Sequence, residues 1–341
     1  MIVVLKLHPS PEDVAEVERH VRDLGYEPHT LQGEVRTVIA CIGDETSHLD
    51  LHALLNLPMV SEVLPIQKKY KLISREVHPE ARPVQVGPLR ISADTFHMIA
   101  GPCAVESLEQ TVSTAKAVKA AGATLLRGGA YKPRTSPYDF QGLGREGLAI
   151  LAEAKRETGL PIVTELVSER DTDAVAEVAD VIQIGARNAL NYALLTEAAR
   201  TGRPILLKRG LSATVQEWLL AAEYIAKQGN SNIILCERGI RTYETITRNT
   251  LDLGAVAAVK RETGLPVFVD PSHAAGRLDL VEPLSRAAVA LGADGLLVEV
   301  HPDPEHALSD AAQQMTFEGF RAYTAALRPW VDLTKRSHAL G

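Results

Sequence analysis

The chain has 341 residues, of which 45% are hydrophobic, 36 are basic and 43 are acidic, which gives a formal net charge of −7. This length accommodates a barrel of about 250 residues together with a small additional domain. The negative charge argues against general nucleic-acid binding, because no basic field attracts a polyanion. No run of about 18 apolar residues occurs, so the sequence predicts no membrane-spanning helix.

The number of cysteines and the N-terminal residues together indicate the cellular compartment of the protein. Cys41, Cys103 and Cys236 are too few and too widely spaced for a disulfide framework, which favours a reducing environment. The opening residues, MIVVLKLHPSPED, lack the basic region and the long apolar run of a signal peptide. We therefore expect a cytoplasmic protein without membrane or nucleic-acid partners.

Residues 1–70 predict a small domain of their own. The expected elements are a strand at 2–7, a helix at 11–24, strands at 26–31 and 35–42, a helix at 48–57 and a strand at 60–67. The order β-α-β-β-α-β is that of a ferredoxin-like fold. Residues 71–94 then predict a proline-bearing linker and a short hairpin, at 86–93, that closes the bottom of the following domain.

From residue 95 to 330 the pattern repeats strand and helix. The apolar runs that predict strands are 96–102, 124–129, 161–166, 181–186, 204–209, 232–237, 266–271 and 295–300. The segment KRETGLP occurs at 155–161 and again at 260–266, each time where a helix ends and a strand begins. Eight such units predict an α/β chain with a (β/α)8 TIM barrel, and residues 331–341 are left as a C-terminal tail.

Polar residues follow the predicted strands at the end where barrel enzymes carry their active sites. One set can bind a divalent metal through a thiolate, an imidazole and two carboxylates: Cys103, His273, Glu299 and Asp310. These donors do not choose among Mn, Fe, Co and Zn. Each has a structural alternative, such as a core cysteine or a helix cap, and Cys236 and His301 are rival ligands.

A second set on this rim is cationic. Its members are Arg127, Lys132, Arg134, Arg187, Lys208 and Arg238. Together they can accept more than one phosphate or carboxylate group. Three of them lie in the segment LRGGAYKPRTSP, whose paired glycines permit a close backbone approach and whose Thr135 and Ser136 add hydroxyl groups. The alternative for this segment alone is a solvated, positively charged loop.

Several longer motifs carry a resemblance to a known family. They are IAGPCAVES, LRGGAYKPRTSPYDFQGLG, IQIGARN, LLKRG, CERG, DPSHAAGR and EVHPDPEHALSD, in this order over residues 85–330. The chain resembles the 3-deoxy-D-arabino-heptulosonate 7-phosphate (DAHP) synthases, in the type Iβ class that also includes octulosonate-phosphate synthases. The resemblance implies a metal-dependent condensation of phosphoenolpyruvate with erythrose 4-phosphate, which begins the shikimate pathway to aromatic amino acids.

The resemblance also implies roles for individual residues. The metal ligands would be Cys103, His273, Glu299 and Asp310. Phosphoenolpyruvate would be held by Arg127, Lys132, Arg187, Lys208 and Arg238. Erythrose 4-phosphate would be held by Arg134, Thr135, Ser136 and Asp270. The residues at the reacting atoms would be Lys132, Cys103 and His273, with Lys132 as the general acid at the aldehyde oxygen.

Two other functions are compatible with parts of this pattern. An octulosonate-phosphate synthase, which uses arabinose 5-phosphate, shares most motifs but typically carries Lys-Ala-Asn-Arg-Ser after its second strand. This chain has Lys132-Pro133-Arg134-Thr135-Ser136 there, which is the heptulosonate form. A non-catalytic phosphate-binding sensor is the second alternative, and the intact set of metal-binding and cationic residues argues against it.

Residues 1–70 carry no catalytic constellation. Related synthases use such a domain to sense tyrosine or phenylalanine, so the resemblance implies feedback inhibition by one of them and assembly as a homotetramer. The alternative is a domain that serves only packing or oligomerisation.

Overall fold

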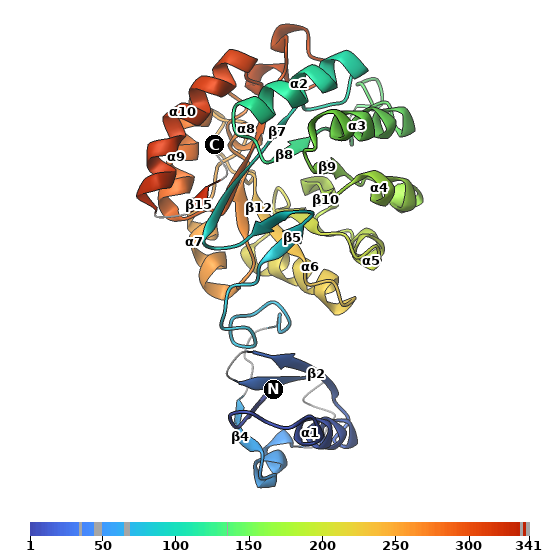
Figure 1. Cartoon of the computed structure of the whole chain (residues 1–341), viewed down its shortest axis with the longest axis vertical. Coiled ribbons are helices and arrows are strands. Elements are labelled where there is room, and N and C mark those ends of the chain that lie inside the picture. Colours follow the sequence, from blue (N-terminus) through green and yellow to red (C-terminus); the bar gives the residue numbers. More distant parts are fainter. Residues whose placement is uncertain (34–35, 44–49, 65–68, 135, 335–336, 339–341) are drawn as a thin grey trace. The chain divides into compact units, whose positions relative to one another are not determined.

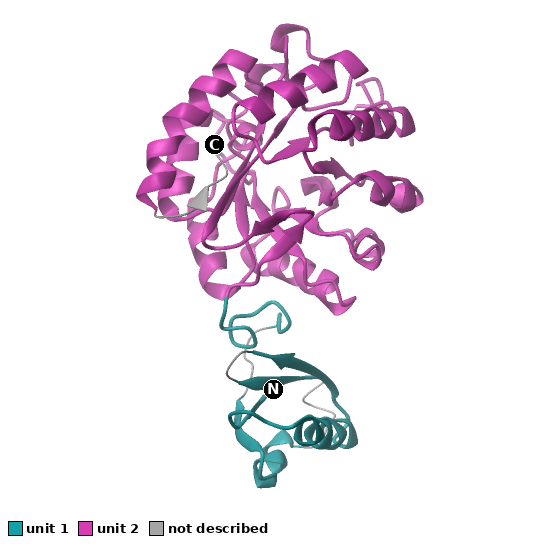
Figure 2. Cartoon of the chain, in the orientation of Figure 1, with its two compact units in different colours: residues 1–80 teal, residues 81–341 magenta. Residues whose placement is uncertain are grey.

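The structure is a computed structural model that describes residues 1–33, 36–43, 50–64, 69–134, 136–334 and 337–338. The chain divides into two units, Met1–Glu80 and Ala81–Gly341 (Figure 2). The boundary between the units lies ten residues after the predicted end of the small domain at residue 70, within the segment 71–94 that was predicted as linker and hairpin.

The first unit contains a four-stranded antiparallel sheet in the order β2-β3-β1-β4. The strands are β1 (Ile2–Leu5), β2 (Glu27–Gln32), β3 (Thr37–Ile42) and β4 (Val60–Leu64). Helix α1 (Pro11–Asp23) begins at a capping box formed by Ser10 and Asp13. Its valines at 14, 17 and 21 share one face and are buried with residues of the sheet. This is the expected ferredoxin-like arrangement.

The second expected helix of this unit is a 3₁₀ helix, η1 (Leu51–Asn56), and residues 48 and 49 lie outside the described part of the chain. Its end follows from Pro58, which disfavours helical geometry at Leu57; that residue has ψ of 132°. The short helix still buries Leu51 and Leu54 in the core of the unit.

The second unit is a closed barrel of eight parallel strands. They are β7 (Thr95–Gly101), β8 (Leu125–Arg127), β9 (Ile162–Glu165), β10 (Val181–Ile184), β11 (Ile205–Lys208), β12 (Ile233–Glu237), β13 (Val267–Val269) and β14 (Gly295–Glu299). Strand β14 pairs with β7, which closes the sheet. Each strand is fully buried except at the first residue of β7, as expected for strands covered on both faces (Figure 1).

Helices surround the barrel (Figure 1). They are α2 (Leu108–Ala120), α3 (Arg145–Thr158), α4 (Thr172–Val178), α5 (Tyr192–Arg200), α6 (Val215–Lys227), α7 (Leu253–Glu262), α9 (Leu278–Leu291) and α10 (Phe317–Leu333). A short additional helix, α8 (Pro271–Ala275), follows β13 directly. The two-residue strand β15 (Ser337–His338) pairs with the start of β7.

A hairpin covers the amino ends of the barrel strands. Strands β5 (Val84–Val86) and β6 (Leu89–Ile91) pair with each other, two residues earlier than expected at both ends. Val84, Val86 and Ile91 belong to the apolar cluster that fills the barrel, together with side chains from all eight strands. The polar site must therefore lie at the opposite, carboxyl end of the strands.

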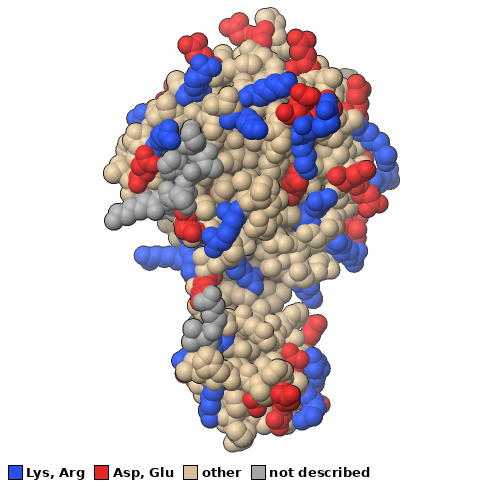
Figure 3. Space-filling model, viewed as in Figure 1, with Lys and Arg blue, Asp and Glu red and all other residues tan. Residues whose placement is uncertain are grey.

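Acidic and basic side chains are interspersed on the face of the molecule shown in Figure 3. Among the described helices, none is both long enough and apolar enough to cross a membrane. Three basic residues near the carboxyl ends of barrel strands, Arg127, Lys208 and Arg238, are by contrast buried.

Candidate metal centre and anion pocket

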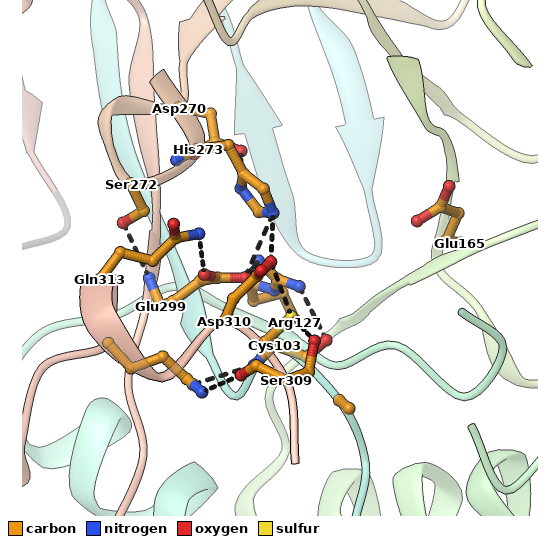
Figure 4. A network of polar contacts seen from close by, with 12 residues as sticks. Cys103, Arg127, Glu165, Asp270, Ser272, His273, Glu299, Ser309, Asp310 and Gln313 are labelled. Atoms are coloured by element: carbon orange, nitrogen blue, oxygen red, sulfur yellow. Dashed lines mark hydrogen bonds and ion pairs between the residues drawn. The ribbon is translucent and has the colours of Figure 1, made fainter. Parts of the chain in front are cut away.

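Four side chains with metal-binding atoms converge at the carboxyl ends of the strands. Cys103 follows β7, His273 lies on α8, Glu299 ends β14, and Asp310 follows in the next loop. One donor atom from each lies within 4.8 Å of the others (Figure 4). Residues far apart in the sequence thus meet because parallel strands end at the same rim.

His273 presents one ring nitrogen to this cluster. Its Nδ1 lies 2.7 Å from Oδ2 of Asp270, which also accepts a hydrogen bond from Nζ of Lys208 at 2.5 Å. When Nδ1–H donates a hydrogen bond to Asp270, Nε2 carries no proton and its lone pair is available to a metal ion. Nε2 lies 3.4 Å from Oε1 of Glu299 and 3.6 Å from Oδ2 of Asp310. Burial lowers the pKa of His273, which favours the neutral, ligating imidazole.

Cys103 is fully buried beside groups of both charges. Its Sγ lies 2.9 Å from Oγ of Ser309, 3.1 Å from Nζ of Lys132 and 3.4 Å from Oδ2 of Asp310. Burial, reinforced by the charge of Glu299, raises the pKa of the thiol to about 12. A bound divalent cation would reverse this balance, because it stabilises the thiolate directly.

The two carboxylates complete a donor set that fits a divalent transition metal. Burial raises the pKa of Glu299, but the nearby His273 and Arg127 lower it by more than burial raises it. The pKa of Glu299 therefore lies below its usual range. The same holds for Asp310, whose pKa burial raises and His273 and Arg248 depress. Asp310 also adopts a left-handed backbone with φ of 51°, which is uncommon for a non-glycine residue. One sulfur, one nitrogen and two anionic oxygens therefore face a common point.

The two rival ligands lie elsewhere. Cys236 belongs to the apolar cluster inside the barrel. His301 places Nε2 3.3 Å from Oε2 of Glu106, and its Nδ1 accepts a hydrogen bond from the backbone of Asp303. The sequence did not exclude these two residues as metal ligands. Among the residues that the structure describes, only the four predicted ligands bring their donor atoms together.

A cationic pocket that is open to solvent adjoins the four donors. All six predicted cations line it: Arg127, Lys132, Arg134, Arg187, Lys208 and Arg238. They come from different strand ends and loops, so their charges are spread around the pocket and can meet more than one anionic group. Burial lowers the pKa of Arg238, and Arg127 is held by Glu299 at 2.7 Å.

Three of the residues predicted to bind erythrose 4-phosphate are not among the described residues that line the pocket. Thr135 lies outside the described residues. Ser136 is not among the residues that line the pocket, and its Oγ accepts a hydrogen bond from the backbone of Tyr138. Asp270 is fully buried, and its oxygens already accept bonds from Lys208 and His273. In this arrangement Asp270 orients other groups.

Five residues of the site were not assigned a role from the sequence. Glu165 and Gln183, joined by a hydrogen bond of 3.2 Å, line the pocket. A Cβ at residue 185 would lie 1.9 Å from Oε1 of Glu165, so Gly185 makes room for this carboxylate. Arg248 lines the pocket from the long loop after β12, and Gln313 contacts Glu299. The position of Glu165 at a strand end was the one signal available.

Comparisons with known proteins agree with this geometry. Residues 82–335 match the model described as DAHP synthetase I family, and residues 1–68 match the DAHP synthase ferredoxin-like domain. A phospho-2-dehydro-3-deoxyheptonate aldolase of Thermotoga maritima is 50% identical over 332 residues, which cover 97% of this chain and 98% of that protein. A 2-dehydro-3-deoxyphosphooctonate aldolase of Magnetococcus marinus is 35% identical over 73% of this chain and 92% of its own.

Solved structures are similar as well. The crystal structure of the Thermotoga maritima aldolase (DAHP synthase) aligns with a TM-score of 0.79 at 49% identity, covering 99% of this chain and 98% of that chain. A truncated form of 3-deoxy-D-arabino-heptulosonate 7-phosphate synthase from the same organism aligns with a TM-score of 0.75 at 50% identity, covering 79% of this chain and 99% of that one.

Proposed function

Because the chain belongs to the DAHP synthetase I family, whose model spans its entire barrel, we propose that this enzyme condenses phosphoenolpyruvate with D-erythrose 4-phosphate. The products are 3-deoxy-D-arabino-heptulosonate 7-phosphate and inorganic phosphate, in the first step of the shikimate pathway. The observation that carries the proposal is the pocket itself, in which six cationic side chains adjoin four metal-binding donors. Two phosphorylated substrates, one of them also a carboxylate, need such a distribution of positive charge.

The protein groups divide the work between binding and proton transfer. Arg127, Lys208 and Arg238, with Arg187, neutralise the carboxylate and phosphate of phosphoenolpyruvate before reaction. Arg134, whose Nη2 donates to Ser309, binds the phosphate of the aldose. A divalent cation at Cys103, His273, Glu299 and Asp310, when bound, supplies Lewis acidity for the aldehyde oxygen.

Bond formation joins carbon three of phosphoenolpyruvate to the aldehyde carbon. Lys132, whose Nζ lies 3.1 Å from Sγ of Cys103, is the proposed general acid that donates a proton to the developing alkoxide. Water then adds at carbon two and loses one proton. The resulting phosphohemiketal collapses to the ketone as phosphate leaves by cleavage of its bond to that carbon and takes up the hydroxyl proton. The cations that line the pocket stabilise negative charge during these steps, because they are held there before the reaction begins.

The first prediction concerns the aldose. With manganese present, the full chain should release phosphate from phosphoenolpyruvate and erythrose 4-phosphate, with a kcat/KM at least about 100-fold higher than with arabinose 5-phosphate. The segment Pro133-Arg134, which lines the pocket, is the physical reason to expect this preference. Faster turnover of arabinose 5-phosphate would favour the octulosonate reaction, and no phosphate from either aldose would favour a sensor. Chelation of the metal should abolish turnover.

The first unit is proposed to regulate the barrel. It matches the ferredoxin-like domain of DAHP synthases over residues 1–68, and none of its described residues is among those that line the pocket. We infer that it senses tyrosine or phenylalanine, through contacts between small domains of neighbouring subunits in a homotetramer.

A truncation tests this regulatory role. Removal of residues 1–80 should leave kcat within about threefold and abolish inhibition by tyrosine or phenylalanine, because the barrel has its own apolar core. The measurement is phosphate release at increasing amino-acid concentration for both lengths of chain. Indifference of the full-length enzyme to both amino acids would contradict the proposal.

A further inference from the structure

Gln313 is a buried neutral side chain that lies between the metal-binding cluster and the pocket wall. Only 2% of its surface is exposed. Its Nε2 donates a hydrogen bond of 2.6 Å to Oε2 of Glu299 (Figure 4). Its Oε1 accepts a hydrogen bond of 3.3 Å from Nη1 of Arg248, which lines the pocket. The amide therefore uses both its ends on groups of opposite charge.

These contacts fix which way the amide faces. A guanidinium has donors only, and an ionised carboxylate has acceptors only, so the amide oxygen must face Arg248 and the amide nitrogen must face Glu299. A neutral carboxamide is suited to this position, because a second carboxylate would repel Glu299 and a second cation would repel Arg248. The hydrogen bond to Glu299 is charge-assisted, the stronger class of such bonds.

Gln313 also determines how Glu299 can turn. Oε1 of Glu299 accepts a bond from Arg127 at 2.7 Å and faces Nε2 of His273 at 3.4 Å. Oε2 accepts its bond from Gln313, and the backbone nitrogen of Glu299 donates to Oγ of Ser272 at 3.3 Å. With each oxygen assigned to a different donor, the carboxylate plane cannot rotate away from the cluster.

The chain brings Gln313 back to Glu299 by a specific local path. Asp310, in its left-handed conformation, begins the 3₁₀ helix η5 (Ala311–Gln313), which reverses the loop. Met315 then donates its backbone nitrogen to the carbonyl of Glu299 at 2.9 Å, as the segment pairs with the end of β14. The side chain at 313, three residues after Asp310, is thus brought next to Glu299 by hydrogen-bonded backbone.

We propose that Gln313 is a positioning residue for the metal centre: it holds Glu299 in its metal-binding orientation, and Arg248 fixes the orientation of Gln313. The inference rests on the proposed function, because it concerns the metal that this function requires. Partners that orient a metal ligand typically change metal affinity about 10–100-fold when they are removed. Gln313 never touches the metal or the substrates in this role.

The experiment measures metal affinity directly, on the metal-free full chain. Gln313→Met keeps the size of the side chain and removes both hydrogen bonds, and Gln313→Asn keeps the amide but is one carbon too short to reach Glu299. We expect both variants to raise the dissociation constant for Co²⁺ about 10–100-fold, in a titration followed by visible absorption with a competing chelator. The two variants differ in polarity, so the Asn variant decides the matter if the Met variant does not fold.

Two controls separate positioning from general damage. Gln110 is also buried, but the hydrogen bonds of its amide go to the backbone of Ala104 and Glu106 and to the hydroxyl of Thr111, and not to any of the four donors. Gln110→Met should leave the dissociation constant within about threefold of the wild type. In a Glu299→Gln background, whose affinity is already reduced, Gln313→Met should add less than about threefold, since the two residues act through one contact.

Each outcome has a definite meaning. Unchanged affinity in both Gln313 variants, or fully additive losses with Glu299→Gln, would overturn the inference while leaving the metal centre intact. A wild-type chain that binds no divalent cation would contradict the metal centre of the proposed function itself. Wild-type binding combined with the expected losses supports both.

Discussion

Lys132→Met is expected to lower kcat about 10²–10⁴-fold, the usual contribution of a general acid. The ammonium group lines the pocket and donates to the backbone oxygen of Cys103 at 3.0 Å, with Sγ of the same residue at 3.1 Å. Methionine preserves most of the side-chain volume and removes the proton. Steady-state kinetics at saturating metal and substrates measures the change.

The matched control for this variant is Lys227→Met, at an exposed position in the last turn of α6. It should leave kcat within about twofold. The metal dissociation constant of Lys132→Met should stay within about tenfold of the wild type, because Lys132 is not one of the four donors. A loss of kcat smaller than about tenfold would show that another group protonates the aldehyde oxygen.

Lys208→Met is expected to destabilise the barrel by about 3–5 kcal/mol, because it leaves the buried carboxylate of Asp270 without its ammonium partner. Lys208 and Asp270 are both almost fully buried and lie 2.5 Å apart. Burial raises the pKa of Asp270, but His273 and Lys208 hold it well below its usual range, so the carboxylate is charged and needs compensation. Urea unfolding measures the loss.

Tryptophan fluorescence reports this unfolding for the barrel alone, since both tryptophans, Trp218 and Trp330, lie in the second unit. The double variant Lys208→Met/Asp270→Asn removes the buried charge and should recover at least half of the lost stability. If the double variant is as unstable as Lys208→Met, packing rather than an uncompensated charge explains the effect.

The sequence predicted the barrel because its strands are continuous apolar runs separated by amphipathic helices. It also predicted which residues would meet: Cys103, His273, Glu299 and Asp310 lie up to about two hundred residues apart, yet each follows a strand that ends at the same rim. Polar residues directly after buried strands are a strong signal, because barrel geometry gathers all such positions.

The sequence did not predict contacts that depend on loop conformation. Arg248 lies in a long loop without helices or strands. Nothing in the neighbouring sequence indicates that its side chain contacts Asp310. Gln313 reaches Glu299 only because Asp310 adopts a positive φ, which residue type alone does not specify. The helix expected at 48–57 likewise ends at Asn56, because the proline after Leu57 disfavours helical geometry at that residue.

The hairpin β5–β6 determines from which end of the barrel small molecules reach the pocket. Its apolar side chains and those of the strands fill the barrel from the amino end, so in the described part of the chain the pocket opens only toward the carboxyl rim. We therefore expect both proposed substrates to enter, and both products to leave, at the carboxyl rim. A molecule bound deep in the pocket cannot leave while another molecule occupies the rim. We therefore expect the substrates to bind, and the products to leave, in a fixed order. Product-inhibition kinetics measures this order.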